Sequence, residues 1–228
     1  MTTTFDRREA ASDIAAALGV IVLAWAICRG WLYPALGIPG NAPLILRPIG
    51  GFLVAWWLLR RRDQRWDSVG LCLPSSWLRA VIVAIALYAA LWFLSPLASS
   101  WFATWLPAPS QPGFLAYIHG NLPATLLWIG IGWVVGGFCE EALFRGFLID
   151  RVTTALGGGT FAIGAAVVAQ ALLFGSLHYY AGPIAFAHAA FFGLLLGTAR
   201  VIGGRSLLPM IVVHGTWDML GIWGVYTG

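Results

Sequence analysis

The chain of 228 residues has no lysine, only three glutamates and only three cysteines, and 10% of its residues are charged. An ordinary soluble domain has roughly 25% charged residues. Disordered chains are polar and highly charged, and secreted disulfide scaffolds are rich in cysteine, so both classes are excluded. Cys28, Cys72 and Cys139 show no C-x-x-C spacing, and we interpret them as small apolar side chains.

Hydrophobic residues are abundant where charges are scarce. They make up 60% of the chain, which includes 13 Trp and 13 Phe. A protein of this size cannot hide so much apolar surface from water, because much of a small domain lies near its surface. The sequence therefore predicts an integral membrane protein. Its net charge is +4, and its arginines lie between apolar runs, a pattern that orients a membrane protein in the bilayer. We therefore do not expect the positive charge to bind nucleic acid.

Several apolar runs have about the 20 residues that a transmembrane helix needs. They cover residues 12–28, 42–59, 78–97, 122–144, 160–178, 184–200 and 207–225. The predicted fold is all-α, a polytopic transmembrane helix bundle with about seven spans. The first run shows no small-x-small cleavage site and is expected to be retained. The Trp- and Pro-rich connection around residues 101–112 is expected at the membrane interface, where it could add an eighth short helix.

The arginines predict the orientation. With a cytoplasmic N-terminus, eleven of the 13 arginines fall on the cytoplasmic side and only Arg29 and Arg47 fall outside. Cytoplasmic loops carry the excess of positive charge, so this orientation is preferred. We divide the chain into an N-terminal flank, residues 1–119, and a core, residues 120–228.

Two adjacent glutamates stand out. Glu140 and Glu141 close the fourth apolar run, and an ionisable group inside a membrane by default marks a functional site. The alternative is a helix end that has already reached the cytoplasm, with Arg145 as its partner. Glu141 and Arg145 are four residues apart and can pair on one helix face. Glu140 points about 100° away from that face and is not held by the pair.

A histidine on the next helix matches Glu140 in depth. Glu140 and His178 each lie 19 residues from Gly159, at the centre of the predicted hairpin turn. Equal distances from the turn give equal depth in an antiparallel hairpin, so the two side chains can face each other. The alternative is a core histidine whose hydrogen bonds are satisfied locally.

The last helix adds His214 and Asp218, four residues apart on a face that is otherwise apolar. Burial of both polar groups needs a reason, and the alternative to a functional role is that Asp218 satisfies His214. His188 lies beside Gly193-x-x-x-Gly197, a spacing that lets helices approach closely, so we expect it to have a packing role. His119 is expected to be exposed.

In their order on successive helices, these residues resemble the motifs of the CPBP family of intramembrane proteases, which includes the CAAX prenyl endopeptidases of the Ras-converting type. The resemblance covers roughly residues 120–225. The four matching segments are Glu140-Glu141-Ala-Leu-Phe144-Arg145, Phe174-Gly-Ser-Leu-His178, His188 to Gly197, and His214-Gly-Thr-Trp-Asp218. The family usually has Asn at the position of Asp218.

The resemblance implies an endopeptidase that cuts near the C-terminus of membrane-attached proteins without a metal or another cofactor. Glu140 is implied as the general base that activates a water together with His178. His214 and Asp218 would face the developing oxyanion.

Glu141 and Arg145 are implied to fix the helix and tune Glu140. The implied partners are a membrane-anchored protein or peptide substrate and the lipid bilayer. All basic residues are arginine, and the chain is rich in Ala and Gly. This composition suggests a prokaryotic protein, which would lie in the inner membrane.

Two alternatives remain open. One is a zinc metalloprotease with Glu140, His178 and His214 as ligands, although the chain has no H-E-x-x-H motif. The other is a membrane protein that keeps the same fold without catalysis, such as an immunity factor or a chaperone.

Overall fold

The structure, a computed structural model, describes residues 6–39, 42–107 and 113–228. All regular structure in these ranges is helical, as the sequence predicts, and each predicted apolar run forms a long helix. The long helices are α1 (Arg7–Ile27), which continues through η1 (Cys28–Leu32) into α2 (Tyr33–Ala35); α3 (Leu46–Arg61); α4 (Trp77–Ala103); α5 (Leu122–Ile131), which continues through η4 (Gly132–Leu148) into α6 (Ile149–Ala155); α7 (Gly159–Leu177); α8 (Pro183–Gly203); and α9 (Leu208–Thr227).

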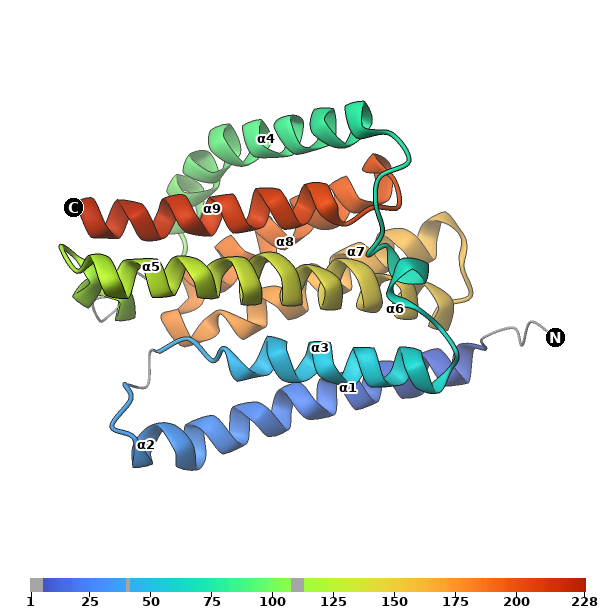
Figure 1. Cartoon of the computed structure of the whole chain (residues 1–228), viewed down its shortest axis with the longest axis horizontal. Coiled ribbons are helices and arrows are strands. Elements are labelled where there is room, and N and C mark those ends of the chain that lie inside the picture. The colour runs from blue at the N-terminus through green and yellow to red at the C-terminus, as the bar shows by residue number, and fades with distance from the viewer. Residues whose placement is uncertain (1–5, 40–41, 108–112) are drawn as a thin grey trace.

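These helices lie side by side, with the start of α1 and the end of α9 at opposite ends of the bundle (Figure 1). Within the described residues, five helical stretches are long and apolar enough to cross a membrane: Arg7–Ala35, Trp77–Ala103, Leu122–Ala155, Gly159–Leu177 and Pro183–Gly203. α3 has only 16 residues, and α9 contains the polar His214 and Asp218. The helical membrane bundle is confirmed, and passage of α3 and α9 across the membrane stays a prediction.

Local signals set the helix ends. Asn121 stands two residues before Pro123 at the start of an apolar run, which predicts a helix cap from the sequence. Its side chain accepts a hydrogen bond from the Ala124 amide at 3.3 Å and so caps α5. The Ser76 hydroxyl caps α4 in the same way. Gly157, Gly158 and Gly159 have φ values of 91°, 78° and 83°, which glycine adopts readily, so the chain turns there between α6 and α7.

The connection between α4 and α5 differs in part from the expectation. α4 extends to Ala103 and takes in Trp101, and a short 3₁₀ helix, η3 (Phe114–Ile118), follows later. Pro109 and Pro112 lie outside the described residues.

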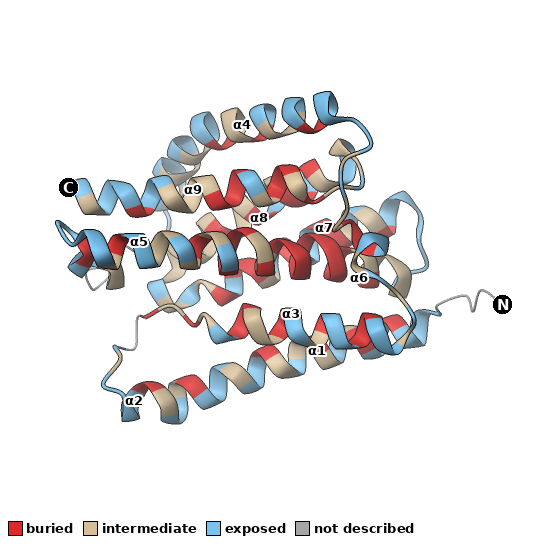
Figure 2. Cartoon of the chain, in the orientation of Figure 1, coloured by how far each residue is buried: buried red, intermediate tan, exposed pale blue. Residues whose placement is uncertain are grey.

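The N-terminal helices share one core with the C-terminal ones. Ile21 of α1 and Leu58 of α3 belong to the same buried cluster as Phe144, Phe147 and Phe174. Figure 2 shows buried residues concentrated along the continuation of α5 through the centre of the bundle, whereas α4 exposes much of its surface. The proposed division at residue 119 therefore does not interrupt the packing, and it stays a prediction.

A buried ion network ties the arginine-rich end together. Asp13 of α1 has 0% exposure and lies 2.8 Å from Arg62 and 2.9 Å from Arg151. From the sequence, both arginines are expected only to orient the chain in the membrane. The structure shows that they also join α1 to the end of α3 and to α6.

The arginine distribution predicts that residues 63 and 228 lie on opposite sides of the membrane. Asp63→Cys and Gly228→Cys would each be introduced into a chain whose Cys28, Cys72 and Cys139 are replaced. An impermeant maleimide applied to intact cells should label position 228 and should label position 63 only after permeabilisation. Labelling of both positions from one side would contradict a topology with seven spans.

Candidate active site

The two glutamates lie on the central helix of the bundle. From Gly132 to Leu148 this helix has wider, π-helical turns, a geometry that is rare and often found at functional sites. Glu141 and Arg145 form the expected ion pair at 2.9 Å, and both side chains have 0% exposure. The alternative of a solvated helix end is therefore wrong, because the helix continues to Ala155 and buries the pair.

Arg145 is also held by an aromatic ring. Its guanidinium carbon lies 4.4 Å from the centre of the Phe174 ring on α7, within the range of a cation–π contact. Gly193 of α8 leaves room for this group, since an added Cβ there would lie 3.5 Å from an Arg145 nitrogen. The guanidinium is thus enclosed between three helices.

His214 has a different partner from the one that its own helix suggests. Its Nδ1 lies 2.6 Å from Oε1 of Glu141, the same oxygen that pairs with Arg145. A carboxylate only accepts hydrogen bonds, so Nδ1 of His214 carries a proton and is the donor of this hydrogen bond. Glu141 therefore links the central helix to α9 and fixes the orientation of the imidazole ring.

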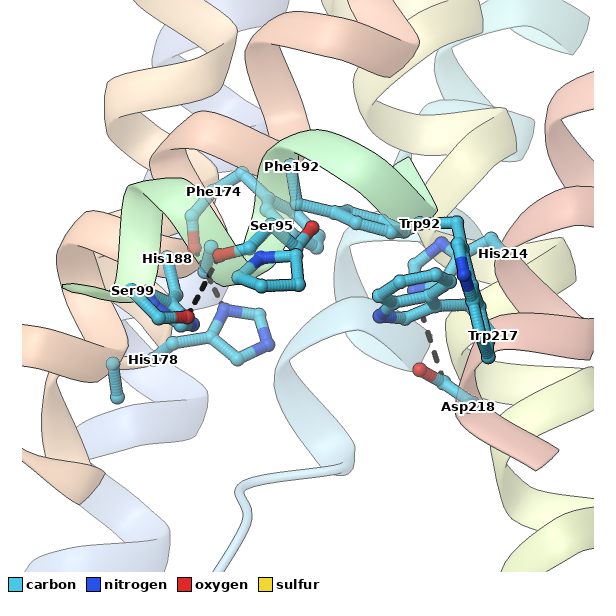
Figure 3. Close-up of a pocket in the computed structure, with 13 residues that line it drawn as sticks. Trp92, Ser95, Ser99, Phe174, His178, His188, Phe192, His214, Trp217 and Asp218 are labelled. Atoms are coloured by element: carbon cyan, nitrogen blue, oxygen red, sulfur yellow. Dashed lines mark hydrogen bonds and ion pairs between the residues drawn. The ribbon is translucent and has the colours of Figure 1, made fainter. Parts of the chain in front are cut away.

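The second ring nitrogen of His214 faces two more carboxyl groups. Its Nε2 lies 3.9 Å from Oε2 of Glu140 and 3.7 Å from Oδ2 of Asp218, beyond hydrogen-bond distance in both cases. The alternative in which Asp218 satisfies His214 does not describe this geometry, since Glu141 makes the short contact. Figure 3 shows Asp218 beside His214 at the wall of a cavity.

His178 lies at the end of α7. Its Nδ1 is 2.9 Å from the Phe174 carbonyl oxygen, which can only accept, so Nδ1 donates and Nε2 is left as an acceptor in the neutral ring. His178 and Glu140 line the same cavity of about 490 Å³, together with His214 and Asp218. Both side chains therefore border one cavity, and their direct facing of each other stays a prediction.

A second cavity, of about 720 Å³, meets the first at this point. His178, His214, Trp217 and Asp218 line both cavities. The wall of the second cavity comes mainly from α4 and α8, and Figure 3 shows His178 apart from His214 and Asp218 across it. These residues therefore form a wall that the two cavities share.

The remaining histidines behave differently from one another. His119 is exposed, as expected. His188 lines the larger cavity, and its ring centre lies 5.6 Å from that of Phe102. Its buried Nε2 has no hydrogen-bond partner among the residues described, and its packing role stays a prediction. The close approach of α7 and α8 depends instead on glycine, because a Cβ at Gly175 would lie 2.7 Å from the Phe186 carbonyl oxygen.

Sequence reasoning missed Arg47 and Tyr180 as site residues. Both line the smaller cavity, and Arg47 is only 7% exposed. From the sequence, Arg47 is expected on the outer side of the membrane, as one of the two arginines outside the cytoplasmic excess. The available signal was an isolated arginine at the start of an apolar run, a position where a buried charge needs a reason.

Among the described ranges, no group of three or more His, Cys, Asp or Glu side chains is placed to hold a metal ion. Cys28 and Cys139 are buried free thiols, in line with their interpretation as apolar side chains.

Comparison with known families identifies the C-terminal part. Residues 122–220 match the family model described as Rce1-like, type II CAAX prenyl endopeptidase. The match contains all four motifs, and it supports the CPBP/CAAX protease family that they indicate. The family points to a protease that processes membrane-associated proteins. Neither the curated proteins nor the solved structures contain a significant match.

The contact between the central helix and α9 depends on small residues. A Cβ at Gly215 would lie 2.4 Å from the Trp133 ring, whereas a Cβ at Gly221 on the same helix would meet nothing within 4 Å. Gly215→Ala should therefore destabilise the protein by about 1–3 kcal/mol through overpacking. Gly221→Ala should be neutral or slightly stabilising, since alanine favours a helix. Thermal unfolding in detergent compares the two variants, and equal melting temperatures would contradict the close packing at Gly215.

Proposed function

We propose that the protein is an intramembrane endopeptidase in which Glu140 activates the attacking water. The observation that carries this proposal is the convergence of Glu140, His178, His214 and Asp218 on one cavity inside a helix bundle. Peptide hydrolysis needs an activated water and a stabilised oxyanion, and these four side chains offer groups for both tasks.

Glu140 is the proposed general base. Its side chain is not part of the Glu141–Arg145 pair, and 13% of it is exposed, so it can meet a water in the cavity. The proposed water donates one proton to Glu140 and a second hydrogen bond to Nε2 of His178. Its oxygen attacks the scissile carbonyl carbon, the C–N bond breaks, and the leaving amine takes the proton back from Glu140.

His214 is the proposed oxyanion donor. Because Nδ1 donates to Glu141, His214 can also donate from Nε2 only if the ring carries both protons. The nearby carboxylates of Glu140 and Glu141 offer negative charge that an imidazolium ring would balance. Glu141 and Arg145 are proposed as positioning residues, since both are fully buried and act through His214 and Glu140.

The family that these motifs resemble usually has Asn at the position of Asp218. An ionised Asp218 would repel an oxyanion, so we propose that it acts in its protonated form and donates a hydrogen bond. Its Oδ2 would lie 2.4 Å from a Cβ at Gly136, which shows how tightly the central helix approaches it. Because Gly136 has no side chain, there is room for Asp218 at this position.

The proposed substrates are C-terminal segments of membrane-attached proteins, which arrive from the lipid bilayer. The smaller cavity is lined by the start of α3, by α5 and by the C-terminal part of α9, and all of these lie at the end that carries the C-terminus (Figure 1). Under the proposed topology this is the outer side of a prokaryotic inner membrane, and the N-terminus is cytoplasmic.

Glu140→Gln and His178→Ala should each reduce proteolysis by a factor of about 10²–10⁴, the usual contribution of an acid–base group. The test is cleavage of a panel of C-terminal membrane peptides by purified protein in detergent. Glu9→Gln, at the exposed start of α1, is the matched control and should keep full activity. Full activity of folded Glu140→Gln would contradict the proposed base, and a wild-type protein that cleaves no peptide would favour a role without catalysis.

A further inference from the structure

Arg47 is a buried cation without an acidic partner. It lies at the start of α3 and is 7% exposed. One of its nitrogens donates to the Leu177 carbonyl oxygen, and its Nε is buried without a hydrogen-bond partner. In the part of the chain that the structure describes, no carboxylate forms an ion pair with it. Burial of an unpaired charge is costly, so a ligand that completes the pair would be strongly favoured.

The surroundings of Arg47 specify the kind of ligand. Arg47 lines the cavity of about 490 Å³ that also contains Glu140 and His178. This volume lies within the range of roughly 300–1,000 Å³ that is typical of ligand pockets. Most of the remaining wall is apolar, with Leu44, Ile45, Ile131 and Ile222 among its residues. A ligand that fits is therefore short and apolar and carries one negative charge.

The other cavity has a different character. Its wall comes from Trp92, Pro96, Ala189 and Phe192 on α4 and α8, and Asp218, which both cavities share, is the only Asp, Glu or Arg among its lining residues. A peptide that passes Glu140 and His178 would thus have one part in a space without arginine or glutamate side chains and the other part beside an arginine. The two cavities therefore favour one orientation of a bound peptide chain.

We propose that Arg47 binds the α-carboxylate of the substrate, so that the protein releases a short C-terminal fragment into the smaller cavity. The membrane-anchored part of the substrate then occupies the larger cavity. Arginine suits this task because its planar guanidinium forms paired, charge-assisted hydrogen bonds with a carboxylate. The inference rests on the proposed peptidase function and adds a residue that determines specificity and lies outside the matched family segment, residues 122–220.

The test compares two peptides that differ only at the C-terminus, one with a free carboxylate and one with an amide, both with the same lipid anchor. The wild type should cleave the free acid with a kcat/KM at least about 10-fold higher, the effect of one charged hydrogen bond. Arg47→Gln should lose this preference, so that the ratio of the two kcat/KM values falls toward one. Arg47→Lys should retain part of the preference, since it keeps the charge.

Arg29→Gln is the matched control. Arg29 also comes from the N-terminal part, and it donates to the Ala42 carbonyl at 3.0 Å, but it does not line the cavity. This variant should keep the preference for the free acid. The result separates a specific carboxylate site from a general effect of positive charge near the cavity.

The outcomes separate failure of the peptidase function from failure of the carboxylate site at Arg47. If the wild type cleaves neither peptide, the proposed peptidase function fails. If it cleaves both peptides equally, or if Arg47→Gln keeps the preference, the carboxylate site is overturned and the peptidase function stands. The comparison of the two peptides with the wild type decides the matter even if Arg47→Gln does not fold.

Discussion

The carboxylate of Glu141 is the point on which the candidate site depends. One of its oxygens lies 2.9 Å from Arg145 and 2.6 Å from Nδ1 of His214, and all three side chains are buried. Loss of one member of a buried charged group leaves the others without compensation, which typically costs about 3–5 kcal/mol. The network therefore fixes where α9 lies against the central helix and which way the His214 ring points. The glycines at the contact, such as Gly215, allow the helices to come close enough for these short distances.

The site also depends on helices outside the matched family segment. α4 supplies Trp92 and Pro96 to the larger cavity, and α3 supplies Arg47 to the smaller one. Glu140, by contrast, lies on the helix that runs through the centre of the bundle. Polar groups on the central helices are thus combined with cavity walls from the N-terminal helices, and in the proposed function these walls select the substrate.

Much of the fold could be predicted from the sequence, because apolar runs, caps and glycine turns act locally. Asn121 and Gly157 mark their helix ends as expected, and the i,i+4 spacing of Glu141 and Arg145 is enough to predict their ion pair. The bond between Glu141 and His214 spans 73 residues and depends on how two helices pack, which periodicity along one helix does not reveal. The same holds for Arg47, whose burial follows from the packing of α3 beside the end of α7.

The proposed mechanism requires His214 to donate from both ring nitrogens, through Nδ1 to Glu141 and through Nε2 to the oxyanion. The most direct test is nitrogen-15 NMR of the His214 ring in the intact protein in detergent, at the pH where it is active. The proposed mechanism predicts chemical shifts of a ring protonated at both nitrogens. It also predicts that Glu141→Gln, which removes the charge, changes the protonation of the His214 ring. Shifts of a neutral ring in the wild type, with a single proton on either nitrogen, would contradict it.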